Sequence, residues 1–289
     1  MNNSLSLWNV VLVSYGEIVI KSDAVRRLMT RKLLRNIRSA LRSEGIKGRV
    51  KHEHTRIVVE STRLSDVVNV LKRVFGIETI SYARRLKLQE LEKFLTDNVT
   101  SILGNAKTFA IRVRRVGEHP FTSLELAKKL GSIVTSKLNV KVDLENAERI
   151  INVEVRDDTC YIYTEKFRGY GGLPIGVSGR VVALISTGID SPVAAWMIMK
   201  RGSPIIALHA LLYNDDVEVE RFRKIVEVLR KWHYGEELKA YTYEHKHALK
   251  EIAKHAGRYT CVLCKRLMYR VAERIAKIRN AKAIVTGES

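Results

Sequence analysis

The chain has 289 residues, 46% of them hydrophobic, and a formal net charge of +20, values that exclude a disordered or fibrous protein. No apolar run approaches the ~20 residues of a membrane span, the three cysteines are too few for a disulfide scaffold, and no signal-peptide pattern is present. We therefore expect a soluble, cytoplasmic protein. The positive charge favours a polyanionic partner such as nucleic acid, with a generally basic surface as the alternative.

The first 86 residues predict a β-α-β-β-α-β order, which is the split ferredoxin-like pattern. Ser22 and Asp23 offer an N-cap to apolar residues at helical spacing, and Gly45 ends that helix. The other expected elements are strands at 9–15, 47–53, 56–60 and 77–86 and a helix at 64–75 that Gly76 closes.

A second α+β segment follows, and it carries basic residues with little aromatic interleaving. We expect helices at 89–103 and 122–138, a strand at 108–115, and a hairpin of 150–156 and 159–165 around Asp157 and Asp158. This composition favours recognition of RNA by backbone and shape over stacking on single-stranded bases. The alternative is an ordinary solvated strand face. The candidate RNA-binding residues are Arg112, Arg114 and Arg115 on the strand and Lys128 and Lys129 on the following helix.

Residues 168–179 read as a linker rich in glycine, and the remainder alternates strand with helix. A dinucleotide fingerprint is excluded there, because Pro174 replaces its last glycine and the segment precedes a strand. The alternation predicts an α/β domain with a doubly wound parallel sheet. Its expected strands are 181–186, 204–211, 237–243 and 282–286, and its helices 191–201, 216–233, 245–256 and 262–280.

The stretch from Ser186 to Ser191 follows the first strand of this sheet, where ligands bind in such folds. Thr187 and Gly188 are small, so the backbone can approach a ligand closely. The helix that begins at Asp190 directs free N–H groups and its positive dipole end at the loop. This pattern predicts a phosphate-binding loop that is not of the Walker type. The alternative is a simple turn with Asp190 as a helix cap.

The segment STGIDSPVA resembles the loop of the PP-loop ATP pyrophosphatases, usually S-G-G-x-D-S, with Thr187 in place of a glycine. Together with GGLPIG, MIMKRG, CVLCKRLMYRVAERIA and AIVTGES, it resembles the tRNA 4-thiouridine synthetase family of tRNA sulfurtransferases. The resemblance implies a ferredoxin-like domain at 1–77, a THUMP domain at 78–166, a linker at 167–179 and a PP-loop domain at 180–289. Because that domain usually continues further, we expect it to be incomplete at its C-terminus.

The resemblance also implies a reaction: ATP adenylylates O4 of uridine 8 in tRNA, and sulfur then displaces AMP to give 4-thiouridine. Mg²⁺ would share the pyrophosphate charge, and Asp190 would be catalytic. Lys265 could instead be a solvated lysine and His209 a satisfied buried histidine. The ATP-binding residues implied are Ala183, Leu184, Ser186, Thr187, Gly188, Asp190, Ser191, Leu208, His209, Lys265 and Gly287. The alternative function is a non-catalytic THUMP-type tRNA-binding protein with an incomplete nucleotide domain.

Cys261 and Cys264 form a C-x-x-C motif that enters a helix, where the dipole and Lys265 would lower a thiol pKa. The pair is a candidate for sulfur transfer, a redox disulfide or two inert core residues, and Cys160 is expected in the core. By resemblance, both cysteines are catalytic and could ligate part of an iron–sulfur cluster. Sulfide or a persulfide-carrying protein would donate sulfur. The sequence leaves open a homodimer and a role in thiamine biosynthesis.

Overall fold

The computed structural model describes residues 5–212 and 216–288, so Ser289, the last residue of the predicted PP-loop domain, lies outside the described residues, as do residues 1–4 of the predicted first domain. The chain divides into two compact units. The first unit comprises Met1–Ser14, Gly45–Lys72 and Thr79–Arg168, and the second comprises Tyr15–Glu44, Arg73–Glu78 and Gly169–Ser289. The described helices include none that is both long and apolar enough to cross a membrane.

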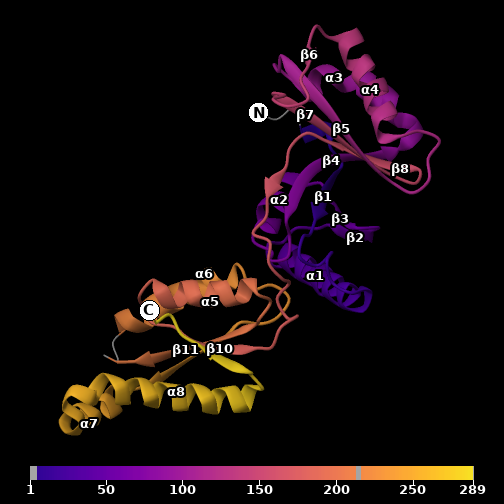
Figure 1. Cartoon of the computed structure of the whole chain (residues 1–289). Helices are drawn as coiled ribbons and strands as arrows, with labels where there is room; N and C mark the ends of the chain where they lie inside the picture. Colours follow the sequence, from indigo (N-terminus) through magenta and orange to yellow (C-terminus); the bar gives the residue numbers. More distant parts are fainter. Residues whose placement is uncertain (1–4, 213–215, 289) are drawn as a thin grey trace. The chain divides into compact units, whose positions relative to one another are not determined.

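One nine-stranded sheet forms the centre of the first unit (Figure 1). Its strand order is β2-β3-β1-β4-β8-β7-β5-β6, with β9 paired to β4. The long strand β4 pairs antiparallel with β1 on one side and with β8 on the other, so strands of the two predicted N-terminal domains share a sheet. The strands are β1 (Val10–Ser14), β2 (Arg49–Glu53), β3 (Arg56–Glu60), β4 (Thr79–Lys87), β5 (Thr108–Val116), β6 (Lys141–Val142), β7 (Arg149–Arg156), β8 (Thr159–Tyr163) and β9 (Phe167–Arg168).

The described residues of the first unit form three α-helices: α2 (Leu64–Leu71), α3 (Leu91–Leu103) and α4 (Ser123–Lys137). Helices α3 and α4 pack together beside β5, and a core that includes Leu95, Leu130 and Ile151 lies between them and the sheet. Short 3-10 turns lie at Leu5–Leu7 and Leu88–Glu90. The predicted elements are confirmed, but the helix at 64–75 is too long. It ends at Leu71 because Arg73–Glu78 folds with the second unit, where Phe75 is buried.

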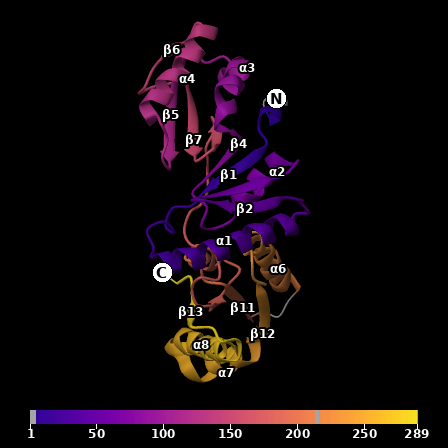
Figure 2. The same cartoon turned by 90° about the vertical axis from the view of Figure 1, so that its right-hand side faces the viewer.

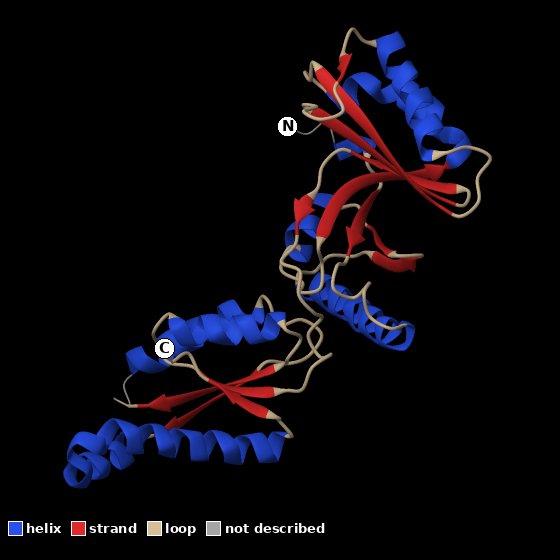
Figure 3. Cartoon of the chain, viewed as in Figure 1, coloured by secondary structure: helices blue, strands red, loops and turns tan. Residues whose placement is uncertain are grey.

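The second unit contains a parallel sheet of order β12-β11-β10-β13. Figure 3 shows α5 and α6 on one face and α7 and α8 on the other, and Figure 2 shows α7 and α8 from a second side. The predicted doubly wound α/β fold is confirmed. Its elements are β10 (Val181–Leu184), α5 (Asp190–Lys200), β11 (Ile205–Leu211), α6 (Asp216–Arg230), β12 (Lys239–Glu244), α7 (Lys246–Ala256), a 3-10 turn (Gly257–Tyr259), α8 (Thr260–Arg279) and β13 (Ala283–Val285).

Helix α1 (Asp23–Ser43) follows the ferredoxin-like strand β1 in sequence, yet it belongs to the second unit. The buried Asn36 side chain donates a 3.0 Å hydrogen bond to the carbonyl oxygen of Ile175 in the linker. Gly235 lies so close that a Cβ there would be 1.9 Å from the Asn36 oxygen. Ser22 is the N-cap residue, but its carbonyl and not its hydroxyl accepts the bond from the N–H of Arg26.

Candidate nucleotide-binding site

The loop between β10 and α5 is held by the first turn of the helix. The Ser191 hydroxyl accepts a 2.8 Å hydrogen bond from the backbone N–H of Ser186, and the two side-chain oxygens lie 2.9 Å apart. The Ser186 hydroxyl in turn accepts a 3.3 Å bond from the N–H of Gly188. Ser191 is buried, whereas Ser186 to Asp190 are exposed. The buried Ser191 therefore holds the shape of the loop, while the exposed residues of the loop remain accessible to an anion.

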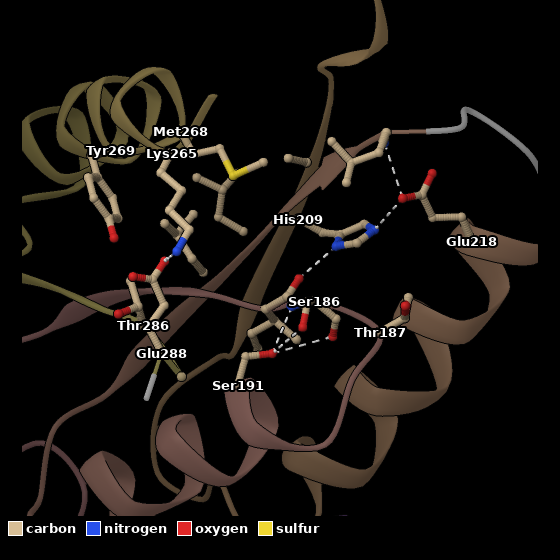
Figure 4. Close-up of a pocket in the computed structure, with 16 residues that line it drawn as sticks. Ser186, Thr187, Ser191, His209, Glu218, Lys265, Met268, Tyr269, Thr286 and Glu288 are labelled. Atoms are coloured by element: carbon tan, nitrogen blue, oxygen red, sulfur yellow. Dashed lines mark hydrogen bonds and ion pairs between the residues drawn. The ribbon is translucent and has the colours of Figure 1, made fainter. Parts of the chain in front are cut away.

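A cavity of about 230 Å³ opens beside this loop, at the carboxyl ends of β10, β11 and β13 (Figure 4). Such an edge is where doubly wound sheets bind their ligands. Aliphatic, hydroxyl and charged side chains share the lining. Its residues are Leu184, Ile185, Ser186, Thr187, Ser191, Leu208, His209, Ala210, Leu212, Glu218, Lys265, Met268, Tyr269, Thr286, Gly287 and Glu288.

Most residues that the sequence assigned to nucleotide binding meet at this cavity. Leu184, Ser186, Thr187, Ser191, Leu208, His209, Lys265 and Gly287 line it. Ala183 does not, because its side chain is in the core between the sheet and α5. Gly188, in the loop, and Asp190, the first residue of α5, are both exposed and do not line the cavity. The expected roles of all of these residues stay predictions.

His209 connects the cavity to the start of α6. Its ring is buried, its Nδ1 donates a 2.6 Å hydrogen bond to the carbonyl of Ile185, and it stacks on Phe222. Its Nε2 lies 3.4 Å from the Glu218 carboxylate, which also accepts a 3.1 Å bond from the N–H of Leu212. His209 is thus a buried, structurally anchored histidine that also reaches the cavity.

Eight lining residues were not among those predicted: Ile185, Ala210, Leu212, Glu218, Met268, Tyr269, Thr286 and Glu288. Met268 and Tyr269 lie one helical turn after Lys265, so the 3.6-residue period of α8 could have indicated them. Thr286 and Glu288 flank the predicted Gly287. Glu218 gave no signal in the sequence, since only the fold brings the start of α6 to His209.

Gly287 makes the closest backbone approach at the site. A Cβ on this residue would lie 2.4 Å from the Ser191 nitrogen and 2.5 Å from its Cα. Real Cβ atoms do not approach backbone this closely, so only glycine fits without displacing β13 or α5. Beyond it, the Lys265 ammonium lies 3.4 Å from the Glu288 carboxylate, with both side chains about half exposed. Lys265 therefore places a solvent-accessible charge, paired with Glu288, at the cavity.

The two cysteines of the C-x-x-C motif differ in environment. Cys261 is exposed in the first turn of α8, whereas Cys264 is buried with its Sγ 3.2 Å from Nε2 of the fully buried His245. Burial, with a smaller contribution from Cys261, raises the pKa of the Cys264 thiol. The expected lowering of the thiol pKa is therefore wrong for Cys264, because burial disfavours its thiolate. Cys160 is buried in β8, and burial raises its pKa to about 12.

No three histidine, cysteine, aspartate or glutamate side chains of the described ranges 5–212 and 216–288 come together as a metal site. Two thiolates one helical turn apart supply at most half of the usual four-cysteine ligation of an iron–sulfur cluster. Cys160 belongs to the first unit, whereas Cys261 and Cys264 belong to the second. The described residues therefore do not fit a complete cluster, and no step is derived through one.

The candidate RNA-binding residues lie exposed on β5 and α4 of the first unit. Arg112 and Arg114 alternate with Val113, so they share a face of the strand, and Arg112 donates a 3.0 Å bond to the carbonyl of Leu144. Lys129 forms an ion pair with Glu92. Arg114, Arg115 and Lys128 form no salt bridge with the described residues, so their charge is available to a ligand.

Comparison with known proteins identifies all three parts of the chain. Residues 176–289 match the family described as Thiamine biosynthesis protein (ThiI), residues 87–165 match the THUMP domain, and residues 10–81 match the ThiI ferredoxin-like domain. A probable tRNA sulfurtransferase of Methanobrevibacter smithii is 40% identical over 294 residues, which cover 98% of this chain and 75% of the relative.

Two solved structures are similar over most of the chain. One is a 4-thiouridine synthetase in complex with RNA and bound ATP, at 31% identity and a TM-score of 0.86, covering 97% of this chain and 74% of that one. The other is a protein from Pyrococcus horikoshii, at 33% identity and a TM-score of 0.74, covering 85% and 82%. With three matching domains in the same order, the chain belongs to the ThiI family of tRNA sulfurtransferases.

Proposed function

We propose that this chain is an ATP-dependent tRNA sulfurtransferase that converts uridine 8 of tRNA to 4-thiouridine. O4 of the uridine attacks the α-phosphorus of ATP, and pyrophosphate leaves. A sulfur nucleophile then adds to C4 of the activated base, and AMP leaves with the former O4. Family membership and the ATP-bound, RNA-bound structure of a relative support this assignment.

The loop from Ser186 to Ser191 is the single observation that carries the proposal. It presents hydroxyls and the N-terminus of α5 beside a cavity whose inner wall is apolar, with Leu184 and Leu208. A triphosphate needs donors and a positive dipole end, and an adenine ring needs apolar contact. The Lys265 ammonium could bind the leaving pyrophosphate, because its flexible side chain is half exposed.

Mg²⁺ fits the donors at this loop. Asp190 is an exposed carboxylate in the first residue of α5, and hard oxygen ligands together with substrate phosphates are the usual Mg²⁺ environment. Asp190 would hold the ion beside the phosphates, where its charge would offset that of the pyrophosphate as it leaves. The carboxylate would thereby orient the phosphates for attack.

Sulfur delivery is assigned to the C-x-x-C motif, with sulfide or a persulfide-carrying protein as the donor. Cys261 is the accessible thiol, and Cys264 is the buried partner one turn away. A persulfide donor can pass its outer sulfur to the exposed Cys261 thiol and leave as a thiol. Attack of the second thiol on the Cys261 Sγ would then release that sulfur onto C4 and leave a Cys261–Cys264 disulfide, which a cellular dithiol would reduce. Sulfide would instead add to C4 directly, without a persulfide. In the proposed domain division, residues 78–166 bind the tRNA and residues 180–289 carry the chemistry. The ferredoxin-like domain at 1–77 precedes the first of these, and the linker at 167–179 joins the two.

The decisive experiment incubates the chain with ATP, Mg²⁺, sulfide and unmodified tRNA and follows the near-UV absorbance of thiouridine. We expect Asp190→Ala to abolish thiolation while tRNA affinity stays within about twofold. Asp97→Ala, an exposed helical aspartate of the first unit, is the matched control and should leave both unchanged. Absence of thiouridine with intact tRNA binding, in a chain shown to bind ATP, would support a non-catalytic binding protein instead.

A further inference from the structure

We propose that Glu288 is the general base of the adenylylation step and accepts the N3 proton of the target uridine. The assignment deepens the proposed function and rests on it. Glu288 lines the nucleotide cavity, its carboxylate is about half exposed, and it pairs with Lys265 across 3.4 Å (Figure 4). It therefore places a proton acceptor where a second substrate can reach it.

The chemistry of uracil requires such an acceptor. In the neutral base, N3 carries a proton and O4 is a carbonyl oxygen of low nucleophilicity. As O4 bonds to the α-phosphorus and pyrophosphate leaves, the electron pair of the N3–H bond forms the N3–C4 double bond, so a base must take the proton. The proton then passes from Glu288 to solvent, which its side chain contacts. N3 of the thiolated base regains a proton from hydrosulfide or water.

Two carboxylates line the cavity among the residues that the structure describes, and they are engaged differently. Glu218 is buried, with Oε1 3.4 Å from Nε2 of His209, and it accepts a 3.1 Å bond from the N–H of Leu212. These contacts make Glu218 an anchor for the start of α6. Glu288 has access to solvent instead, so it is the carboxylate that can exchange a proton with a ligand.

Two other titratable groups near the loop have different roles. Asp190 is exposed at the first residue of α5, does not line the cavity, and is assigned to Mg²⁺ in the proposed function. His209 donates from Nδ1 to the carbonyl of Ile185, and its Nε2 faces Glu218. Neither group is thus placed to take a proton from a base inside the cavity.

The backbone connects Glu288 to the phosphate loop. Gly287 approaches α5 so closely that a Cβ on it would lie 2.4 Å from the Ser191 nitrogen. Glu288 is the next residue along the chain and lines the same cavity. A base whose O4 attacks a phosphate held at the loop therefore presents N3, which is bonded to C4, within reach of this side chain.

Helix α8 supplies the groups that surround the Glu288 carboxylate. Figure 4 shows Lys265 and Tyr269 on the same side of the cavity, near Thr286 and Glu288. Partial burial and, after it, the neighbouring Glu288 carboxylate raise the pKa of Tyr269, so the phenol keeps its proton at neutral pH. Phosphates that bind Lys265 would draw its ammonium from Glu288 and leave the carboxylate for N3–H of the uridine.

The test follows pyrophosphate release from ATP after addition of unmodified tRNA, with no sulfur source present, so that adenylylation alone is measured. Glu288→Gln is compared with Glu273→Gln, which changes an exposed glutamate of α8 that pairs with Lys277. Dissociation constants for ATP and tRNA are measured in parallel, and thermal unfolding confirms that both variants fold.

We expect Glu288→Gln to slow pyrophosphate release by about 100-fold or more, the usual contribution of a general base. Both dissociation constants should stay within about threefold of wild type, and Glu273→Gln should leave the rate unchanged. A Glu288→Gln rate close to that of wild type would overturn the proposal. A loss of ATP affinity as large as the loss of rate would also overturn it, because a residue that only positions Lys265 would give that result.

A substrate with a more acidic N3 separates proton removal from a structural role. Fluorine at C5 withdraws electrons and lowers the pKa of N3–H, so tRNA with 5-fluorouridine at position 8 needs a base less. We expect the ratio of wild-type to Glu288→Gln rates to shrink by about tenfold with this tRNA. An equal ratio for both tRNAs would overturn the role of proton acceptor. Failure of the wild-type chain to release pyrophosphate with both ligands bound would overturn the proposed function instead.

Discussion

The Ser191 hydroxyl, in the first turn of α5, accepts a hydrogen bond from the backbone N–H of Ser186 at the other end of the loop. The Ser191 side chain that accepts this bond is buried, whereas Ser186 is exposed. The geometry of the proposed phosphate site therefore depends on a residue whose role is to shape the loop. Its neighbours Thr187 and Gly188 remain exposed for a ligand.

Substitution of Ser191 by alanine should loosen the loop without disturbing the sheet. Loss of the hydroxyl leaves the N–H of Ser186 without its partner, and we expect the free energy of unfolding to fall by about 1–2 kcal/mol. ATP affinity should fall by about tenfold, measured by calorimetry. Ser132→Ala on the exposed surface of α4 is the control and should change neither quantity. An unchanged ATP affinity in Ser191→Ala would show that the loop holds its shape by other means.

Substitution of Gly287 by alanine tests the close approach between β13 and α5. The added methyl would lie 2.4 Å from the Ser191 nitrogen, so backbone must move, at a cost of about 1–3 kcal/mol in unfolding free energy. ATP binding should weaken because Gly287 also lines the cavity. Gly131→Ala in α4 is the matched control, since nothing lies within 4 Å of its added Cβ. It should stabilise the chain by about 0.5–1 kcal/mol. Similar melting temperatures for the two variants would contradict this account.

The thiols should differ in reactivity. A raised pKa leaves Cys264 with less thiolate at neutral pH, and burial limits access, so iodoacetamide should alkylate the exposed Cys261 first. Modification of Cys264 should accelerate as the pH is raised further above neutral, and mass spectrometry can follow each site. Cys160, with a pKa of about 12, is the internal control and should stay unmodified in the folded chain. Faster alkylation of Cys264 than of Cys261 at pH 7 would contradict the burial argument.

A buried ionic cluster in the first unit should make its stability depend on pH. Burial raises the pKa of Glu154, but hydrogen bonds and charge from Arg56, with hydrogen bonds from Arg156 and Tyr163, outweigh it and lower the pKa overall. The carboxylate thus contributes stability above its unfolded pKa, which is lost as the pH falls through the lower folded pKa.

Glu154→Gln should flatten this acid dependence. At pH 7 it leaves two guanidinium groups beside a neutral amide in the buried cluster, and we expect the free energy of unfolding to fall by about 3 kcal/mol. Urea unfolding between pH 3 and pH 7 measures both effects. Glu251→Gln, on the exposed surface of α7, should behave as wild type. A parallel pH profile in Glu154→Gln and wild type would mean that other carboxylates dominate acid unfolding.

Local pattern was sufficient for much of the fold. Apolar periods of 2 and 3.6 predicted the strands and helices in order, because each element must turn its apolar side to a core. The hydroxyl-rich loop before Asp190 and the C-x-x-C motif were also visible, since both depend on residues adjacent in the chain. The early end of α2 and the two-residue strands β6 and β9 were not predicted, because tertiary contacts and not local pattern define them.

The amino-acid sequence by itself determined the order of elements, the basic character of the chain and the loop that marks its family. Tertiary structure alone decided that α1 folds with the unit that carries the candidate nucleotide cavity, that Glu218 meets His209, and that Cys264 is buried beside His245. The physical reason is separation along the chain. A periodic pattern shows that a face is buried but not what covers it, whereas pKa values and backbone clearances depend on the neighbours that the completed fold supplies.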